Sequence, residues 1–103
     1  MKFKDLVALL TANKAFRVIF KTSGRNVISG HSKITSAAAG ESVLLVLTEQ
    51  DDKKFFETGE SALAALAGVS NADDLGVKIN YAGKEYVLNS ADTEENYVVG
   101  SVA

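Results

Sequence analysis

The spacing of the apolar residues changes near residue 15, and this change constrains the fold more than any other feature of the sequence. Before it, apolar residues stand at i, i+3, i+4 and i+7, the spacing of one stripe along a three-turn helix: Phe3, Leu6, Val7 and Leu10. From residue 15 to 20 the period becomes two, with one side formed by Phe16, Val18 and Phe20. Arg17, Ile19 and Lys21 form the other side. The opening of the chain therefore predicts a helix that packs on a sheet.

Four further segments predict elements later in the chain. Residues 43–47 are an uninterrupted apolar run, typical of a strand covered on both faces, and we expect it at the centre of the sheet. Thr58 can cap a second helix that runs to about Ala67 and ends at Gly68. Residues 77–81 and 84–88 predict a hairpin that turns at Ala82-Gly83.

Three segments carry weaker patterns. Residues 35–42 have no periodicity and predict a connection, and residues 54–57 predict a short strand that pairs back. Residues 97–102 predict a final edge strand or a frayed end. Together the elements predict one α+β domain over residues 1–103, with a mainly antiparallel sheet of about five or six strands and two short helices on one face.

Composition limits the setting of the chain. Without cysteine there is no disulfide framework and no thiolate site, which suits the reducing cytoplasm that we expect as its location. The first ten residues resemble a secretory leader, but Asp5 interrupts a short apolar run, so we do not expect a signal peptide. No stretch reaches the ~18–20 apolar residues that cross a bilayer, and we expect no membrane partner.

The sequence carries no motif for a metal or a cofactor. Its eight glycines form neither a dinucleotide fingerprint nor a phosphate loop. Acidic pairs occur at 51–52, 73–74 and 94–95, but none has the alternating oxygen ligands of a calcium loop. We therefore expect no metal site, no cofactor site and no assignable catalytic residue.

His31 is the only histidine and the only candidate general base. It stands in the run Ser29-Gly30-His31-Ser32, where either serine can be imagined as a nucleophile. Nucleophilic catalysis also requires a third group that orients the base, and the sequence identifies none. A small hydrolase centred on His31 is accordingly kept as the second alternative function.

Charge is distributed unevenly along the chain. Residues 1–40 have a net charge of +6, and residues 41–103 have a net charge of −8. Such asymmetry indicates either an anionic partner for the basic part or two halves that face each other in the fold. Both readings stay open at this point.

Residues 15–34 predict a hairpin whose register decides where its basic groups point. A three-residue loop at 22–24 pairs Lys21 with Arg25 and gathers one basic face: Arg17, Lys21, Arg25, His31 and Lys33. A four-residue loop at 22–25 instead places Phe20 opposite Val27 and buries His31. We favour the shorter loop, because it aligns the apolar residues on the other face.

These observations favour a non-enzymatic protein–protein interaction module, such as an adaptor, an inhibitor or an accessory protein. It would dock on an acidic protein surface through the basic hairpin or through an exposed sheet edge, with a homodimer as one option. The alternative is a nucleic-acid-binding protein that uses residues 14–33. A pI of about 5.3 and the lack of base-stacking aromatic residues on the basic face argue against that alternative.

Overall fold

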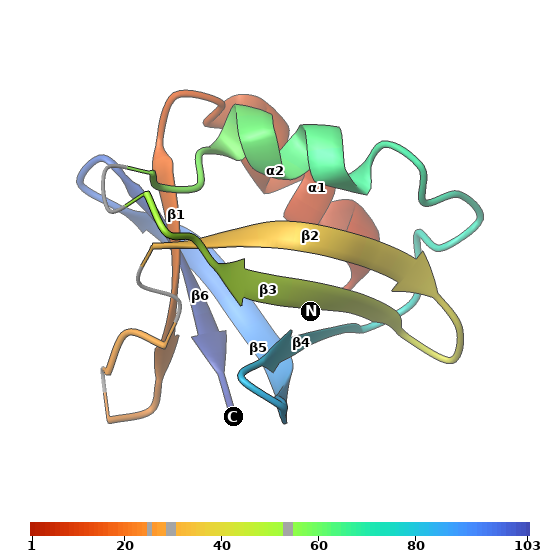
Figure 1. Cartoon of the computed structure of the whole chain (residues 1–103). Helices are drawn as coiled ribbons and strands as arrows, with labels where there is room; N and C mark the ends of the chain where they lie inside the picture. The colour runs from red at the N-terminus through yellow and green to blue at the C-terminus, as the bar shows by residue number, and fades with distance from the viewer. Residues whose placement is uncertain (25, 29–30, 53–54) are drawn as a thin grey trace.

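The computed structural model describes residues 1–24, 26–28, 31–52 and 55–103. In these ranges the chain forms two helices and six strands, which confirms an α+β fold with the predicted number of each (Figure 1). In chain order the elements are α1 (Phe3–Ala12), β1 (Arg17–Thr22), β2 (Ser32–Ala39), β3 (Val43–Glu49), α2 (Gly59–Leu66), β4 (Val77–Tyr81), β5 (Lys84–Glu94) and β6 (Tyr97–Val102). Neither helix is long and apolar enough to cross a lipid bilayer.

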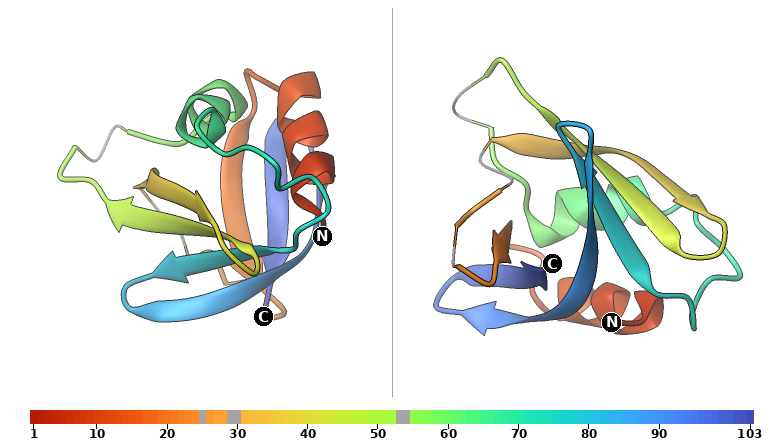
Figure 2. Two further views of the ribbon diagram at one scale, coloured as in Figure 1. Left: turned by 90° about the vertical axis from the view of Figure 1, so that its right-hand side faces the viewer. Right: turned by 90° about the horizontal axis from the view of Figure 1, so that it is seen from below.

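All six strands belong to one sheet, in the order β1-β6-β5-β4-β3-β2. The pairs β1–β6 and β3–β4 are parallel, and the other three pairs are antiparallel. The sheet is therefore mixed, and the expectation of a mainly antiparallel sheet was wrong. The chain enters β4 through a crossover that contains α2, and a crossover of this kind joins parallel neighbours. Figure 2 shows how strongly the sheet twists and curls.

The predicted hairpin over residues 15–34 is also wrong in its pairing. β1 and β2 lie at opposite ends of the strand order, and β2 occupies most of the stretch that we expected to be a connection. β1 turns back only locally, where Lys21 bridges to Val27. Neither predicted register contains this pair, and Arg25, Ser29 and Gly30 lie outside the described residues. β6, which is distant in sequence, pairs with β1 along the whole length of that strand. Residues of a local turn do not encode such a pairing.

Two other placements differ from the expectations. β3 lies next to the sheet's end rather than at its centre, and its residues alternate between buried and half-buried. β6 lies between β1 and β5, so it is not an edge strand. Residues 55–57 form no strand, and residue 54 lies outside the described ranges.

The locally encoded elements are confirmed. α1 ends at Asn13, whose side-chain amide donates to the carbonyl of Leu9. Thr58 caps α2 and forms a reciprocal capping box with Ser61. The β4–β5 hairpin turns at Ala82 and Gly83 with φ of 53° and 80°, the left-handed pair of a type I′ turn.

Both helices bury their apolar faces in one core together with the strands. The fully buried large side chains come from α1 and four strands: Leu10, Val43, Leu45, Val77, Ile79, Leu88 and Val98. The two helices also contact each other, as Figure 1 shows. Burial of this apolar surface is the main favourable term in folding.

Glu57 is buried, with 4% of its surface exposed. It connects the two ends of the sheet. Its main-chain carbonyl accepts a hydrogen bond from the amide of Val18 in β1, at 2.8 Å. Its carboxylate accepts from the amide of Ile34 in β2, at 2.7 Å, and from the hydroxyl of Ser61 in α2. One residue therefore ties β1, β2 and α2 together, where the curled sheet would otherwise be open.

Replacing this carboxylate should destabilise the fold. Glu57→Ala leaves the buried amide of Ile34 without its acceptor, and we expect a loss of about 2–3 kcal/mol in the free energy of unfolding. Glu57→Gln keeps one oxygen and should lose less. Urea denaturation measures both variants against Glu41→Ala, which removes an exposed carboxylate between β2 and β3 and should change stability by less than about 0.5 kcal/mol. Equal stabilities for Glu57→Ala and Glu41→Ala would contradict the assigned role.

Gly59 begins α2 where the helix meets the loop after α1. The amides of Gly59 and Glu60 donate to the carbonyls of Phe16 and Lys14, at 2.9 Å each. A Cβ on Gly59 would stand 3.0 Å from the Cα of Lys14 and closer still to the main-chain carbonyl of Asn13. Only glycine permits this approach between two backbones.

Gly59→Ala should therefore lower the free energy of unfolding by about 1–3 kcal/mol, although alanine is the better helix former. Gly68→Ala is the matched control, because nothing lies within 4 Å of an added Cβ there. Thermal denaturation followed by circular dichroism compares the two. A Gly59→Ala chain as stable as Gly68→Ala would show that the two backbones separate at little cost.

Candidate binding site on the outer face of β1 and β6

The register of β1 against β6 sorts their side chains into two faces. Val18 and Phe20 on β1 and Val98 and Val102 on β6 belong to the hydrophobic core, with Val18 paired to Val98 and Phe20 paired to Gly100. The alternate positions point to the other side of the sheet and form three cross-strand pairs: Arg17 with Tyr97, Ile19 with Val99, and Lys21 with Ser101. The expectation that Arg17, Ile19 and Lys21 share the face away from the core is thus confirmed.

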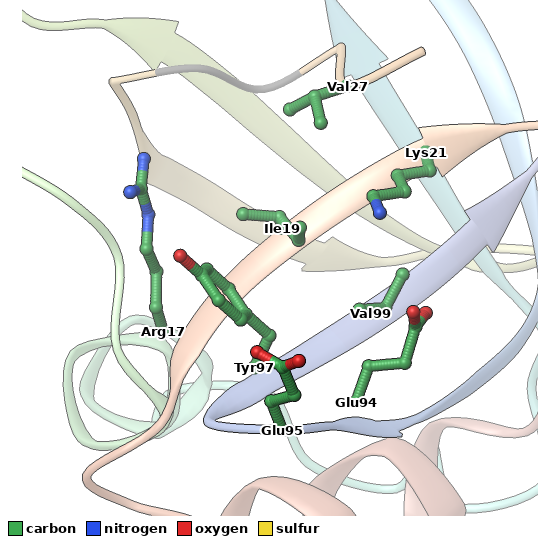
Figure 3. A pocket seen from close by; sticks show the side chains of 8 residues that line it. All are labelled: Arg17, Ile19, Lys21, Val27, Glu94, Glu95, Tyr97 and Val99. Atoms are coloured by element: carbon green, nitrogen blue, oxygen red, sulfur yellow. The ribbon is translucent and has the colours of Figure 1, made fainter. Parts of the chain in front are cut away.

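A pocket of about 430 Å³ lies on this outer face (Figure 3). Its volume is within the usual range of ligand sites. Ile19 and Val99 are almost fully buried although they lie outside the core cluster, and they form an apolar floor. The remaining lining consists of Arg17, Lys21, Val27, Glu94, Glu95 and Tyr97.

The two cations of the pocket, Arg17 and Lys21, have no ion-pair partner in the described part of the chain. The guanidinium of Arg17 lies over the ring of Phe56, 5.2 Å from its centroid, and its buried Nε has no hydrogen-bond partner among the described residues. The positive charge of this guanidinium is therefore not balanced by an ion pair within the described part of the chain.

The opposite wall of the pocket is acidic. Glu94 ends β5 and pairs across the ladder with Tyr97, and Glu95 forms the turn into β6 with a φ of 52°. Asp92 pairs with Val99 and continues the same side of β5. The outer face therefore carries cations on β1, uncharged side chains on β6 and acids on β5.

A second hollow of about 210 Å³ adjoins the pocket and continues along the same strands. The two hollows share Lys21, Glu94 and Val99, and the second adds polar groups from Thr22, Ser23, Asn89 and Ser101. Together they form one groove, which we call the β1–β6 groove.

Four of the five predicted docking residues lie in the described ranges. Arg17 and Lys21 both line the groove, whereas Arg25 lies outside the described residues. Lys33 is exposed on β2 and lines neither hollow. The paired hairpin on which these residues were expected to share one face is not formed, because β2 lies at the other end of the strand order from β1.

His31 is engaged in a structural contact. Its Nδ1 lies 3.0 Å from the main-chain carbonyl of Phe55, and because a carbonyl only accepts, this nitrogen carries the hydrogen. Ser32 is buried, and its hydroxyl has no hydrogen-bond partner within the described chain. Ser32 is therefore not hydrogen-bonded to His31, and Ser29 lies outside the described residues.

Part of the charge asymmetry is resolved inside the fold. Lys2 and Lys4 at the start of α1 form ion pairs with Asp74 at 3.5 and 3.4 Å. The hydrogen bond and charge of Lys4, followed by those of Lys2, hold the pKa of the exposed Asp74 carboxyl below its usual range. The basic and acidic halves of the sequence thus contact each other here, but these ion pairs do not involve Arg17 or Lys21.

Sequence reasoning missed the β6 side of the groove. The alternation of Tyr97, Val99 and Ser101 with apolar or small residues was readable as a two-faced strand. Its pairing with β1, about 80 positions earlier in the chain, was not. Glu94 and Glu95 were noted only as an acidic pair.

Comparison with known proteins finds no match: no family model fits the chain, and neither a curated protein nor a solved structure is similar to it. The functional argument therefore depends on the geometry of the groove.

The unpaired donor of Arg17 leads to a prediction about stability. Arg17→Met keeps an apolar stem of similar length and removes the buried, unpartnered Nε, while it loses the contact of a cation with Phe56. These effects oppose each other, and we expect the free energy of unfolding to change by no more than about 1 kcal/mol. Guanidinium denaturation measures it, and a loss above 2 kcal/mol would assign Arg17 a structural role instead.

Proposed function

We propose that this chain is a non-enzymatic protein-interaction module that docks an acidic segment of a partner protein in the β1–β6 groove. The observation that carries the proposal is the arrangement of Arg17, Ile19 and Lys21 on one outward face, where neither cation forms an ion pair with a described residue and an apolar floor lies between them. A carboxylate that accepts from a guanidinium forms one of the stronger hydrogen bonds available to proteins.

Exposed apolar groups at the groove support a protein partner. Three large apolar side chains are exposed in the described ranges, namely Val27, Phe56 and Val87. Val27 lines the pocket beside Lys21, and Phe56 lies under the guanidinium of Arg17, so each of the two cations has an exposed apolar side chain next to it. Apolar and arginine side chains together are typical of the energetic centres of protein interfaces.

The edge of β1 is less suited to docking than its face. The amides of Val18 and Thr22 donate to the carbonyls of Glu57 and Asn26, and the carbonyl of Phe20 accepts from Ile28. A partner strand would have to displace these hydrogen bonds, whereas a segment that lies on the outer face would not. We therefore favour docking through side chains rather than strand addition, and a homodimer through this edge is not our proposal.

The acidic wall distinguishes a protein partner from a nucleic acid. Glu94 and Glu95 line the same pocket as the two cations, and Asp92 stands beside them on β5. A phosphate backbone would meet these carboxylates with like charge, while a polypeptide can place its acids on one side only. Nucleic-acid binding thus remains the alternative, and a hydrolase centred on His31 remains the second one.

The wider docking surface is part of the proposal. His31 binds the carbonyl of Phe55, next to the ring on which Arg17 lies, and Lys33 follows on β2. We propose that both extend the surface beyond the groove. The lack of cysteine suits the reducing cytoplasm, which we keep as the proposed compartment.

Binding of short peptides tests the proposed function. In an NMR titration of the ¹⁵N-labelled chain, seven-residue peptides with two glutamates and one leucine should shift amides of β1 and β6. Their glutamine counterparts should not. Arg17→Met and Lys21→Met should each weaken binding about tenfold, because each removes a charge that meets a carboxylate. Lys84→Met is the control, since Lys84 lines neither hollow.

A random-sequence DNA 20-mer forms the contrasting arm of the titration. If the DNA binds at low salt and shifts the same amides while the acidic peptides do not, the nucleic-acid alternative replaces the proposal. Activity that survives His31→Ala in ester and phosphoester assays would remove the hydrolase alternative, because His31 is its only candidate base. His31→Ala and Lys33→Met measured with the peptides report how far the surface extends.

A further inference from the structure

The charged and apolar groups of the groove follow a fixed spacing. Arg17, Ile19 and Lys21 alternate on one face of β1, and the rise of a strand places Arg17 and Lys21 about 13 Å apart with Ile19 midway. An extended peptide has the same rise per residue. Its side chains at i, i+2 and i+4 can therefore match the three positions in register.

We propose that the β1–β6 groove recognises an extended segment with acidic residues at i and i+4 and an apolar residue at i+2, an inference that rests on the function proposed above. The two acids meet Arg17 and Lys21, and the apolar side chain covers the floor of Ile19 and Val99. The adjoining hollow beside Lys21 continues the groove, so the segment passes beyond the second cation.

The acidic wall limits what the intervening positions can carry. Side chains at i, i+2 and i+4 of the segment face the sheet, so those at i+1 and i+3 point to solvent. Carboxylates at these intervening positions meet no cation of the groove, and the nearest charges of β5, on Glu95 and Asp92, have the same sign as theirs. The segment is therefore acidic along one side only. This pattern separates specific recognition from general attraction to negative charge.

Peptides of identical composition test the spacing. Three capped nonapeptides carry the cores Glu-Ser-Leu-Ser-Glu, Ser-Glu-Leu-Glu-Ser and Glu-Glu-Leu-Ser-Ser, flanked by serines, so that charge and apolar content are equal. NMR titration of the full chain should give an affinity about fivefold higher for the first core than for the other two. A fourth peptide, with the core Glu-Glu-Leu-Glu-Glu, should bind no more tightly than the first, despite twice its charge.

The results of these titrations distinguish two claims: the proposed spacing of the ligand's side chains, and the proposed function of binding acidic segments. The preference for the first core should disappear in Lys21→Met, where only one cation remains on β1. If all three isomers bind equally and still depend on Arg17 and Lys21, the spacing is refuted and the proposed function stands. If no acidic peptide shifts the amides of β1 and β6, both are refuted. Tighter binding of a peptide with a Lys-Ser-Leu-Ser-Lys core would also overturn the inference, because the acidic side of the groove would then bind the ligand.

Discussion

The hydrogen bonds of one buried residue, Glu57, hold the outer strands of this fold in place. The strand order puts β1 and β2 at opposite ends of the sheet, yet both donate a main-chain amide to Glu57, and α2 donates a serine hydroxyl to its carboxylate. A buried carboxylate is costly unless its oxygens are hydrogen-bonded, so these contacts form together. Phe55 and Phe56 directly precede Glu57 in the chain; His31 hydrogen-bonds to the main-chain carbonyl of Phe55, and Arg17 lies over the ring of Phe56. The geometry of the site thus depends on a residue that does not line it.

The register of three strands then turns a scattered set of charges into an ordered surface. β1 contributes Arg17 and Lys21, β6 contributes Tyr97 and Val99, and β5 contributes Glu94. On this face β1 is basic and β5 is acidic, and the strand between them, β6, carries no charge. The charge asymmetry of the sequence is therefore cancelled in part, where Lys2 and Lys4 pair with Asp74, and on this face it appears as neighbouring basic and acidic columns.

The sequence was sufficient for features that depend on near neighbours. The apolar spacing of α1, the Thr58 cap of α2 and the Ala82-Gly83 turn are local signals, and the structure confirms all three. Alternation also predicted correctly that Arg17 and Lys21 face away from the core. The partner strand did not follow from the sequence, because β1 pairs with β6 across most of the chain and no local residue encodes that choice. The outward residues of β1 in the groove were therefore predictable, whereas the residues that β6 and β5 contribute to it were not.

The uncharged column of β6 explains why the cations of β1 stay available. Two strand spacings separate β1 from β5, so the basic and acidic columns stand about 10 Å apart, close to the Debye length at physiological salt. At that distance their attraction is largely screened where water reaches them, and neither column neutralises the other. The segment that we propose as the ligand would lie over Tyr97 and Val99, displace this water and bring its carboxylates within hydrogen-bond distance of Arg17 and Lys21. The separation that leaves these two cations without an ion pair in the described part of the chain is therefore the same separation that would make room for the segment between the two columns.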